Sequence, residues 1–169
     1  MEYFLMDQDA RTLAGAGVDY RDAGFLGSEP FVTWFDFDEE TKLPDFLQGE
    51  QGGRAIFCIS DEMKEILDNY GCLKETVPVF LTDTQYRAQK VYWKIEAEEA
   101  DCLEQDWFAD KQHMIFESEP PKGRYLFQAR NIKKKYLIVS LELAENLLRR
   151  HMYGIRFYPV RRRSGDETL

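Results

Sequence analysis

The chain has 169 residues, of which 44% are hydrophobic and 14% aromatic, and it carries a net charge of −9 at neutral pH. A chain of this length can bury the core of one domain, and its many core-forming side chains exclude an intrinsically disordered protein. No stretch reaches the roughly 18–20 consecutive apolar residues of a membrane-spanning helix, and the first residues lack the basic region of a signal peptide. We therefore expect one cytoplasmic domain spanning residues 1–169.

Cysteine usage agrees with that location. The three cysteines, Cys58, Cys72 and Cys102, are odd in number and form no CxxC pair. A secreted disulfide framework normally uses an even and denser set. We interpret the three as small buried side chains in a reducing compartment.

Charge is distributed unevenly along the chain. The net charge is −9 for residues 1–50, −8 for residues 51–121 and +8 for residues 122–169. An acidic body repels nucleic acid and anionic membranes, and it speeds the encounter with a basic partner. The alternative, that the charge only keeps the protein soluble, stays open. The pattern favours a protein partner, with no nucleic acid and no membrane.

Strand patterns of aromatic and β-branched residues recur along the chain. The predicted strands are 3–6, 31–37, 77–81, 86–95, 114–116 and 125–127. Residues 7–30 are rich in glycine, aspartate and alanine and predict a long loop with one weak helical turn. The segment after Glu40, through Gln51-Gly52-Gly53, again predicts a loop.

One segment occurs twice. Residues 56–67 match residues 136–147 through Ser60/Ser140, Glu62/Glu142, Glu65/Glu145 and Leu67/Leu147, and after a one-residue shift Pro78-Val79 matches Pro159-Val160. Each serine follows an apolar run and precedes apolar residues at helical spacing, which predicts a helix N-cap. We therefore expect an α+β fold, with a mostly antiparallel sheet and a few helices. It would contain two quasi-equivalent strand–helix–strand units, at 55–82 and 135–161, and a charged tail at 161–169.

Residues for catalysis or metal binding are sparse. The two histidines are His113, in a polar loop, and His151, at a predicted helix end where a cation suits the helix dipole. A thiol hydrolase would need Cys58 or Cys102 beside His113, and nothing near them in the sequence supports that pair. No zinc-ligand spacing, calcium loop or nucleotide-binding glycine motif is present. We predict no enzyme, no metal and no cofactor.

The C-terminal segment resembles a known family. It runs from Ile138-Val139-Ser140 through Leu147-Leu148 to Tyr153-Gly154-Ile155-Arg156-Phe157-Tyr158-Pro159-Val160, with Tyr92-Trp93-Lys94-Ile95 and Asp101-Cys102-Leu103 upstream. This pattern is similar to a bacterial immunity family of polymorphic toxin systems, long catalogued as a domain of unknown function. The resemblance covers residues 55–160 and leaves residues 1–50 unmatched. It implies a non-enzymatic protein that binds and neutralises a cognate toxin; the alternative is a general interaction or regulatory module.

The sequence also suggests where a partner would bind. Trp34 lies in an aromatic strand that is followed at once by Asp36, Asp38, Glu39 and Glu40. Aromatic anchors and acidic residues together would suit a basic toxin. The competing interpretation is an ordinary core strand with a solvated acidic end. A second acidic set, Glu96, Glu98, Glu99 and Asp101, is the next candidate.

Overall fold

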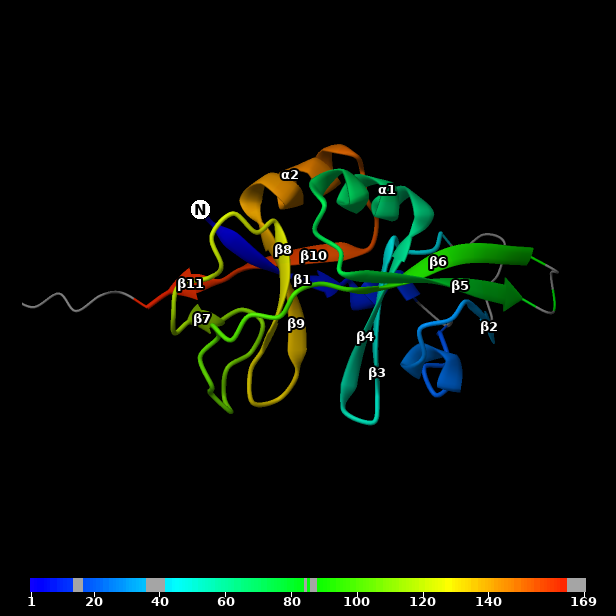
Figure 1. Cartoon of the computed structure of the whole chain (residues 1–169), viewed down its shortest axis with the longest axis horizontal. Helices are drawn as coiled ribbons and strands as arrows, with labels where there is room; N and C mark the ends of the chain where they lie inside the picture. The colour runs from blue at the N-terminus through cyan, green and yellow to red at the C-terminus, as the bar shows by residue number, and fades with distance from the viewer. Residues whose placement is uncertain (14–16, 36–41, 84, 86–87, 164–169) are drawn as a thin grey trace, which may run out of the picture.

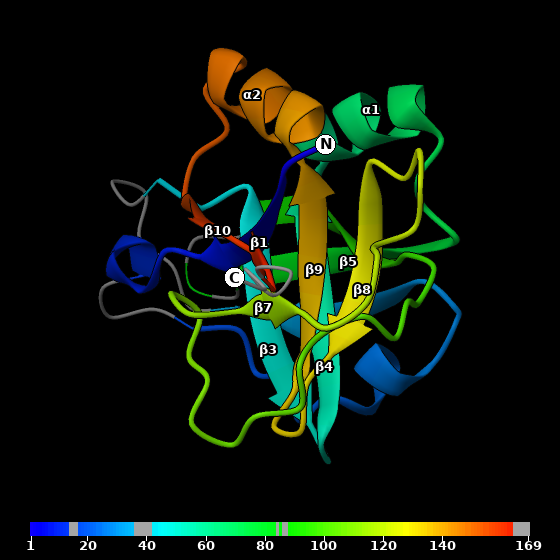
Figure 2. The same cartoon turned by 90° about the vertical axis from the view of Figure 1, so that its left-hand side faces the viewer.

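The structure, a computed structural model, describes residues 1–13, 17–35, 42–83, 85 and 88–163. Within these residues two α-helices lie over two main β-sheets (Figures 1 and 2). Most strand pairs are antiparallel. The α+β class predicted from the sequence is therefore confirmed.

The first sheet has five strands in the order β2-β5-β6-β4-β3. Their bounds are β2 Phe31–Trp34, β3 Phe46–Gln51, β4 Arg54–Ser60, β5 Glu75–Asp83 and β6 Ala88–Glu96, with helix α1 at Asp61–Tyr70. Strand β2 runs parallel to its neighbour β5, and the other described pairs of this sheet are antiparallel. Two short 3-10 helices, Ala10–Leu13 and Ala23–Leu26, lie in the segment predicted as loop.

The second sheet has four strands in the order β10-β1-β9-β8. Their bounds are β1 Tyr3–Gln8, β8 Leu126–Arg130, β9 Lys135–Ser140 and β10 Ile155–Pro159, with helix α2 at Leu141–Arg149. A small parallel pair joins β7 Ile115–Phe116 to β11 Arg161–Arg162. The expectation of a charged tail from residue 161 is wrong for these two arginines, because they pair as a strand; residues 164–169 lie outside the described part.

The two sheets repeat one arrangement. The order β5-β6-β4-β3 in the first corresponds to β10-β1-β9-β8 in the second. The registers agree: Ser60 faces Tyr92 as Ser140 faces Tyr3, and Pro78 faces Trp93 as Pro159 faces Phe4. Both predicted strand–helix–strand units are thus present. The sequence comparison did not reveal that β1, from the other end of the chain, fills the place that β6 fills in the first unit.

Ser60 and Ser140 cap the two helices, as predicted. The Oγ of Ser60 accepts the backbone N–H of Met63 at 3.2 Å, and the Oγ of Ser140 accepts that of Leu143 at 3.3 Å. We expect Ser140→Ala to lower the free energy of unfolding by about 1 kcal/mol. Ser60→Ala should cost more, because the Oγ of Ser60 also donates to Oδ1 of Asp45 at 2.7 Å. Urea denaturation of the two variants checks this order, and equal losses would contradict it.

The helices also end alike, with a left-handed residue after each. Gly71 follows α1 with φ 60°, and His151 follows the C-cap of α2 with φ 58°. Glycine adopts this conformation without strain, whereas a residue with a Cβ does not. We expect His151→Gly to raise the free energy of unfolding by roughly 0.5–1 kcal/mol and Gly71→Ala to lower it by a similar amount. Thermal melts measure both changes, and a stabilising Gly71→Ala would contradict the role of the left-handed residue after each helix.

One buried cluster of side chains joins the two halves of the molecule, the half built on the five-stranded sheet and the half built on the four-stranded sheet. Its members come from both sheets and both helices, and include Met6, Phe57, Leu67, Ile95, Leu137 and Leu147. The helices lie side by side over this core (Figure 2), where Nδ2 of Asn146 donates to the hydroxyl of Tyr70 at 2.8 Å. Such a shared core is the arrangement expected of one domain.

Strand β3 corrects the prediction of a loop. Phe46–Gln51 pairs with β4 in a hairpin that turns at Gly52 and Gly53, both with positive φ. A two-residue glycine turn of this kind matches the twist of antiparallel strands. The sequence pattern does not indicate this strand, because its second half reads Gln-Gly-Glu-Gln. The strand lies at the edge of the sheet, where few of its side chains need to be apolar.

Candidate functional site

One face of the five-stranded sheet changes from buried core to exposed surface along its width. Ile59, Trp93 and Ile95 point to this face and pack beneath the helices. Farther out, the same face continues through Val91, Phe80 and Val32, which are neighbours across β6, β5 and β2. Trp34 follows on β2 two residues after Val32. We call Val32, Trp34, Phe80 and Val91 the open face.

The open face exists because α1 is too short to cover the sheet. Helix α1 covers this face as far as Trp93. The Nε1 of Trp93 donates to Oδ1 of Asp61 at 2.8 Å, and Nζ of Lys64 lies 4.5 Å from the centre of the Trp93 ring. Beyond that point β2, β5 and β6 extend past the helix (Figure 1). Val32 is 51% exposed and Trp34 is 59% exposed, while Phe80 and Val91 are half-buried.

The other face of these strands is ordinary core. Thr33 and Phe35 point to it from the β2 segment, together with Val79 and Leu81 of β5. Phe25, from the second 3-10 helix, packs in the same cluster. The sheet is therefore firmly supported from behind, so Trp34 is held on a rigid strand at the edge of the sheet. Edge strands with exposed apolar side chains are places where another chain can dock.

A hollow adjoins the open face at Val91. It has a volume of about 500 Å³ and is bordered by Lys42, Lys90, Asp61 and Glu62. The two acids belong to the first turn of α1. The hollow offers space and charge of both signs next to the apolar side chains, which is how the rim of a protein interface is built.

Of the predicted partner-binding residues, Trp34 is exposed on the open face. Asp36, Asp38, Glu39 and Glu40 lie outside the described residues. The prediction that aromatic and acidic residues share one patch is therefore untested for these four.

The second acidic set is partly used inside the molecule. Glu98 forms an ion pair with Arg124, and Glu99 forms one with Lys135, which holds the pKa of Glu99 below its usual range. Two further pairs, Arg162 with Glu119 at 3.3 Å and Arg163 with Glu104 at 3.1 Å, follow the same pattern. The basic third of the sequence thus lies against the acidic body, and the charge division along the chain is not a division in space.

The thiols lie in surroundings that disfavour thiolate chemistry. Burial raises the pKa of Cys58 to about 12 and that of Cys102 to about 11. An activated cysteine needs the opposite shift. The imidazole of His113 is exposed at the surface, and its Nδ1 lies 2.7 Å from Oδ1 of Asp110. The pairing that a thiol hydrolase would need therefore finds no support in these contacts.

Metal-ligand clusters and membrane-spanning helices are both absent from the residues that the structure describes. Among them, no three His, Cys, Asp or Glu side chains gather where they could hold a metal ion. No helix in the same part of the chain is long and apolar enough to cross a membrane.

The chain matches no protein-family model, and no curated protein matches it. The resemblance of residues 55–160 to the immunity family therefore stays a prediction from the sequence.

Proposed function

We propose that this protein is a non-enzymatic, immunity-type protein that neutralises a cognate bacterial toxin by binding it. The observation that carries the proposal is the open face, where the core side of a sheet continues to an edge strand beyond the helix that covers it, among the residues that the structure describes. Trp34 stands at its end with 59% of its surface exposed. Tryptophan, with tyrosine and arginine, is enriched among the few residues near the centre of an interface that dominate its binding energy.

The partner should offer an apolar pocket or ridge for Trp34 and Val32, and basic residues around it. The net charge of −9 favours the encounter with such a surface. Close to the open face, Asp61 and Glu62 border the hollow beside Val91. The apolar contact would hold the complex together, and the charges would mainly raise its rate of formation.

A general interaction or regulatory module is the alternative, and it would use the same face. The two functions differ in what the partner does on its own: a toxin stops growth, whereas a regulatory partner does not. A thiol hydrolase is the least favoured candidate, since burial raises the pKa of both Cys58 and Cys102.

The test is site-specific crosslinking in the native host followed by a growth assay. A photo-crosslinking amino acid replaces Trp34 in one strain and Trp107 in another. Trp107 is a matched control, because it is 63% exposed but lies in the loop between β6 and β7. Strand β7, to which this loop leads, and β2 lie toward opposite ends of the long axis (Figure 1). We expect one protein to be captured from position 34 only.

The captured protein is then expressed in a foreign host. The proposal predicts growth arrest, and rescue by co-expressing the wild-type chain or its Trp107→Asp variant. The Trp34→Asp variant should not rescue. A captured partner that leaves growth unaffected would favour the regulatory alternative, and capture only from position 107 would overturn the assignment of the open face.

A further inference from the structure

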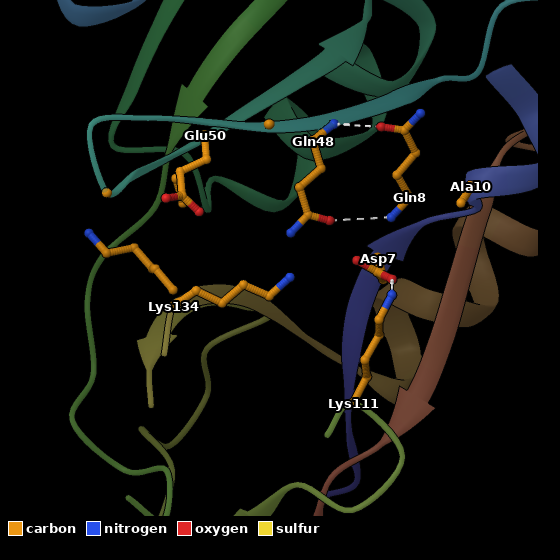
Figure 3. Close-up of a pocket in the computed structure, with 11 residues that line it drawn as sticks. Asp7, Gln8, Ala10, Gln48, Glu50, Lys111 and Lys134 are labelled. Atoms are coloured by element: carbon orange, nitrogen blue, oxygen red, sulfur yellow. Dashed lines mark hydrogen bonds and ion pairs between the residues drawn. The ribbon is translucent and has the colours of Figure 1, made fainter. Parts of the chain in front are cut away.

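A pocket of about 450 Å³ opens where the two halves of the molecule meet. Many of its lining residues belong to the hairpins β3–β4 and β8–β9, which extend away from the helices (Figure 1). Its walls come from β1, β3, β9 and the loop that carries Lys111, so it is assembled from segments far apart in the sequence (Figure 3). This volume is within the range of small-molecule sites, roughly 300–1,000 Å³.

Two glutamines fix the wall between β1 and β3. The backbone N–H of Gln48 donates to Oε1 of Gln8 at 2.8 Å, and the backbone N–H of Gln8 donates to Oε1 of Gln48 at 3.4 Å. Because each amide oxygen faces an N–H donor, the amide nitrogen must point the other way. Figure 3 shows the amide nitrogen of Gln48 turned toward the open centre of the pocket. It is a hydrogen-bond donor held in place, and no described residue accepts from it.

The charged side chains of the pocket fall into two groups. Lys111 is paired with Asp7, and Lys135 is paired with Glu99. Glu50 and Lys134, in contrast, have no ion pair and no side-chain hydrogen bond to any described residue; Nζ of Lys134 lies 5.1 Å from the ring centre of Tyr136. One carboxylate, on β3, and one ammonium, beside β9, therefore line the same pocket without an ion-pair partner among the described residues.

We propose that this pocket binds a small zwitterion, namely a free α-amino acid or a short peptide. The carboxylate of the ligand would pair with Lys134 and accept a hydrogen bond from the amide nitrogen of Gln48. Its ammonium group would pair with Glu50. Glu50 is exposed and Lys134 is half-buried, so water can solvate either charge. A ligand carrying both charges would form charge-assisted hydrogen bonds with both side chains, whereas a simple anion or cation would form them with one.

The proposal can be tested on the purified full-length chain by NMR titration. The probes are the twenty L-amino acids and glycylglycine, each added to about 10 mM, since a weak site has a Kd in the millimolar range. We expect at least one probe to cause saturable shifts in the backbone amides of Gln48, Glu50 and Lys134. The N-acetylated and the C-amidated forms of that probe each lack one charge, and each should bind at least about tenfold more weakly.

Variants separate the pocket from general charge effects. Glu50→Gln and Lys134→Gln should each weaken binding about tenfold. Glu29→Gln and Lys122→Gln, at exposed positions outside the pocket, should leave the affinity unchanged. Unchanged spectra away from the pocket show that each variant is folded. The proposal is overturned if no probe gives a saturable shift, if the neutralised forms bind as tightly as the zwitterion, or if the control variants lose as much affinity as the pocket variants.

Discussion

Deleting residues 1–9 is expected to unfold the C-terminal half of the protein. These residues contain β1, which lies inside the four-stranded sheet between β10 and β9. Leu5 and Met6 are fully buried, and Met6 belongs to the core that both halves share. Removing the strand leaves the hydrogen-bonding edges of two neighbouring strands unpaired and opens the core. Circular dichroism and thermal melts should show the loss of a cooperative transition.

A single substitution in β1 tests the same role of the strand with a smaller expected effect. Leu5→Ala should lower the free energy of unfolding by about 2–5 kcal/mol, because it leaves a cavity in a packed core. Glu2→Ala, at an exposed position just before the strand, should change it by less than about 0.5 kcal/mol. A truncated chain that still melts cooperatively near the wild-type temperature would contradict the role of β1.

Strand β1 takes the place in the second sheet that β6 takes in the first, so moving β1 to the other end of the chain is a stricter test of its role. In the first unit β6 follows β5 directly, whereas in the second unit β1 pairs with β10 from the far end of the chain. The start of β1 lies beside the end of β10, since the backbone N–H of Val160 donates to the carbonyl of Tyr3 at 3.0 Å. Residues 1–9 joined by a flexible linker after Arg163 should therefore restore the fold of the truncated chain.

The second large effect is expected at Asp45, which ties the two halves together. Its Oδ1 accepts the hydroxyl of Ser60 at 2.7 Å, and its Oδ2 accepts the backbone N–H of Tyr153 at 2.6 Å. Asp45→Ala leaves both donors without this acceptor. Hydrogen bonds to charged groups contribute about 1.5–3 kcal/mol each, so we expect a loss of about 3 kcal/mol in the free energy of unfolding.

Two controls define the result at this position. Asp45→Asn keeps the shape of the side chain and should lose about half as much, because a neutral acceptor bonds more weakly than a carboxylate. Asp68→Ala removes an acid from the exposed side of α1 and should cost less than about 1 kcal/mol. Urea denaturation measures the free energy of unfolding of all three variants. A loss for Asp45→Ala no larger than that for Asp68→Ala would contradict the role of Asp45 in joining the two halves.

The sequence predicted those elements whose pattern lies within a short stretch of the chain, and it missed those that depend on distant residues. The two helices were found because Ser60 and Ser140 each follow an apolar strand and begin a stretch of helical periodicity. The pairing of β1 with β9 was not found, because it depends on contacts between opposite ends of the chain. Pattern reasoning sees neighbours along the chain and misses partners that only the fold brings together.

The same distinction applies to the candidate sites. The aromatic strand drew attention to Trp34, but its exposure follows from the length of α1 relative to β5 and β6, which a sequence pattern does not give. Glu50 and Lys134 share a pocket although they are far apart in the chain, and nothing near either residue marks it. Counting charges along the chain was misleading in one respect, since Lys135 is already paired with Glu99.

If the open face binds a protein partner, Trp34 should contribute a large share of the binding energy. Isothermal titration calorimetry of the purified partner would compare the wild-type chain with Trp34→Ala and Trp107→Ala. We expect Trp34→Ala to weaken binding by at least about 30-fold, the effect of losing a side chain worth about 2 kcal/mol at the centre of an interface. Trp107→Ala should bind like the wild type. Equal affinity of the wild type and Trp34→Ala would contradict the account.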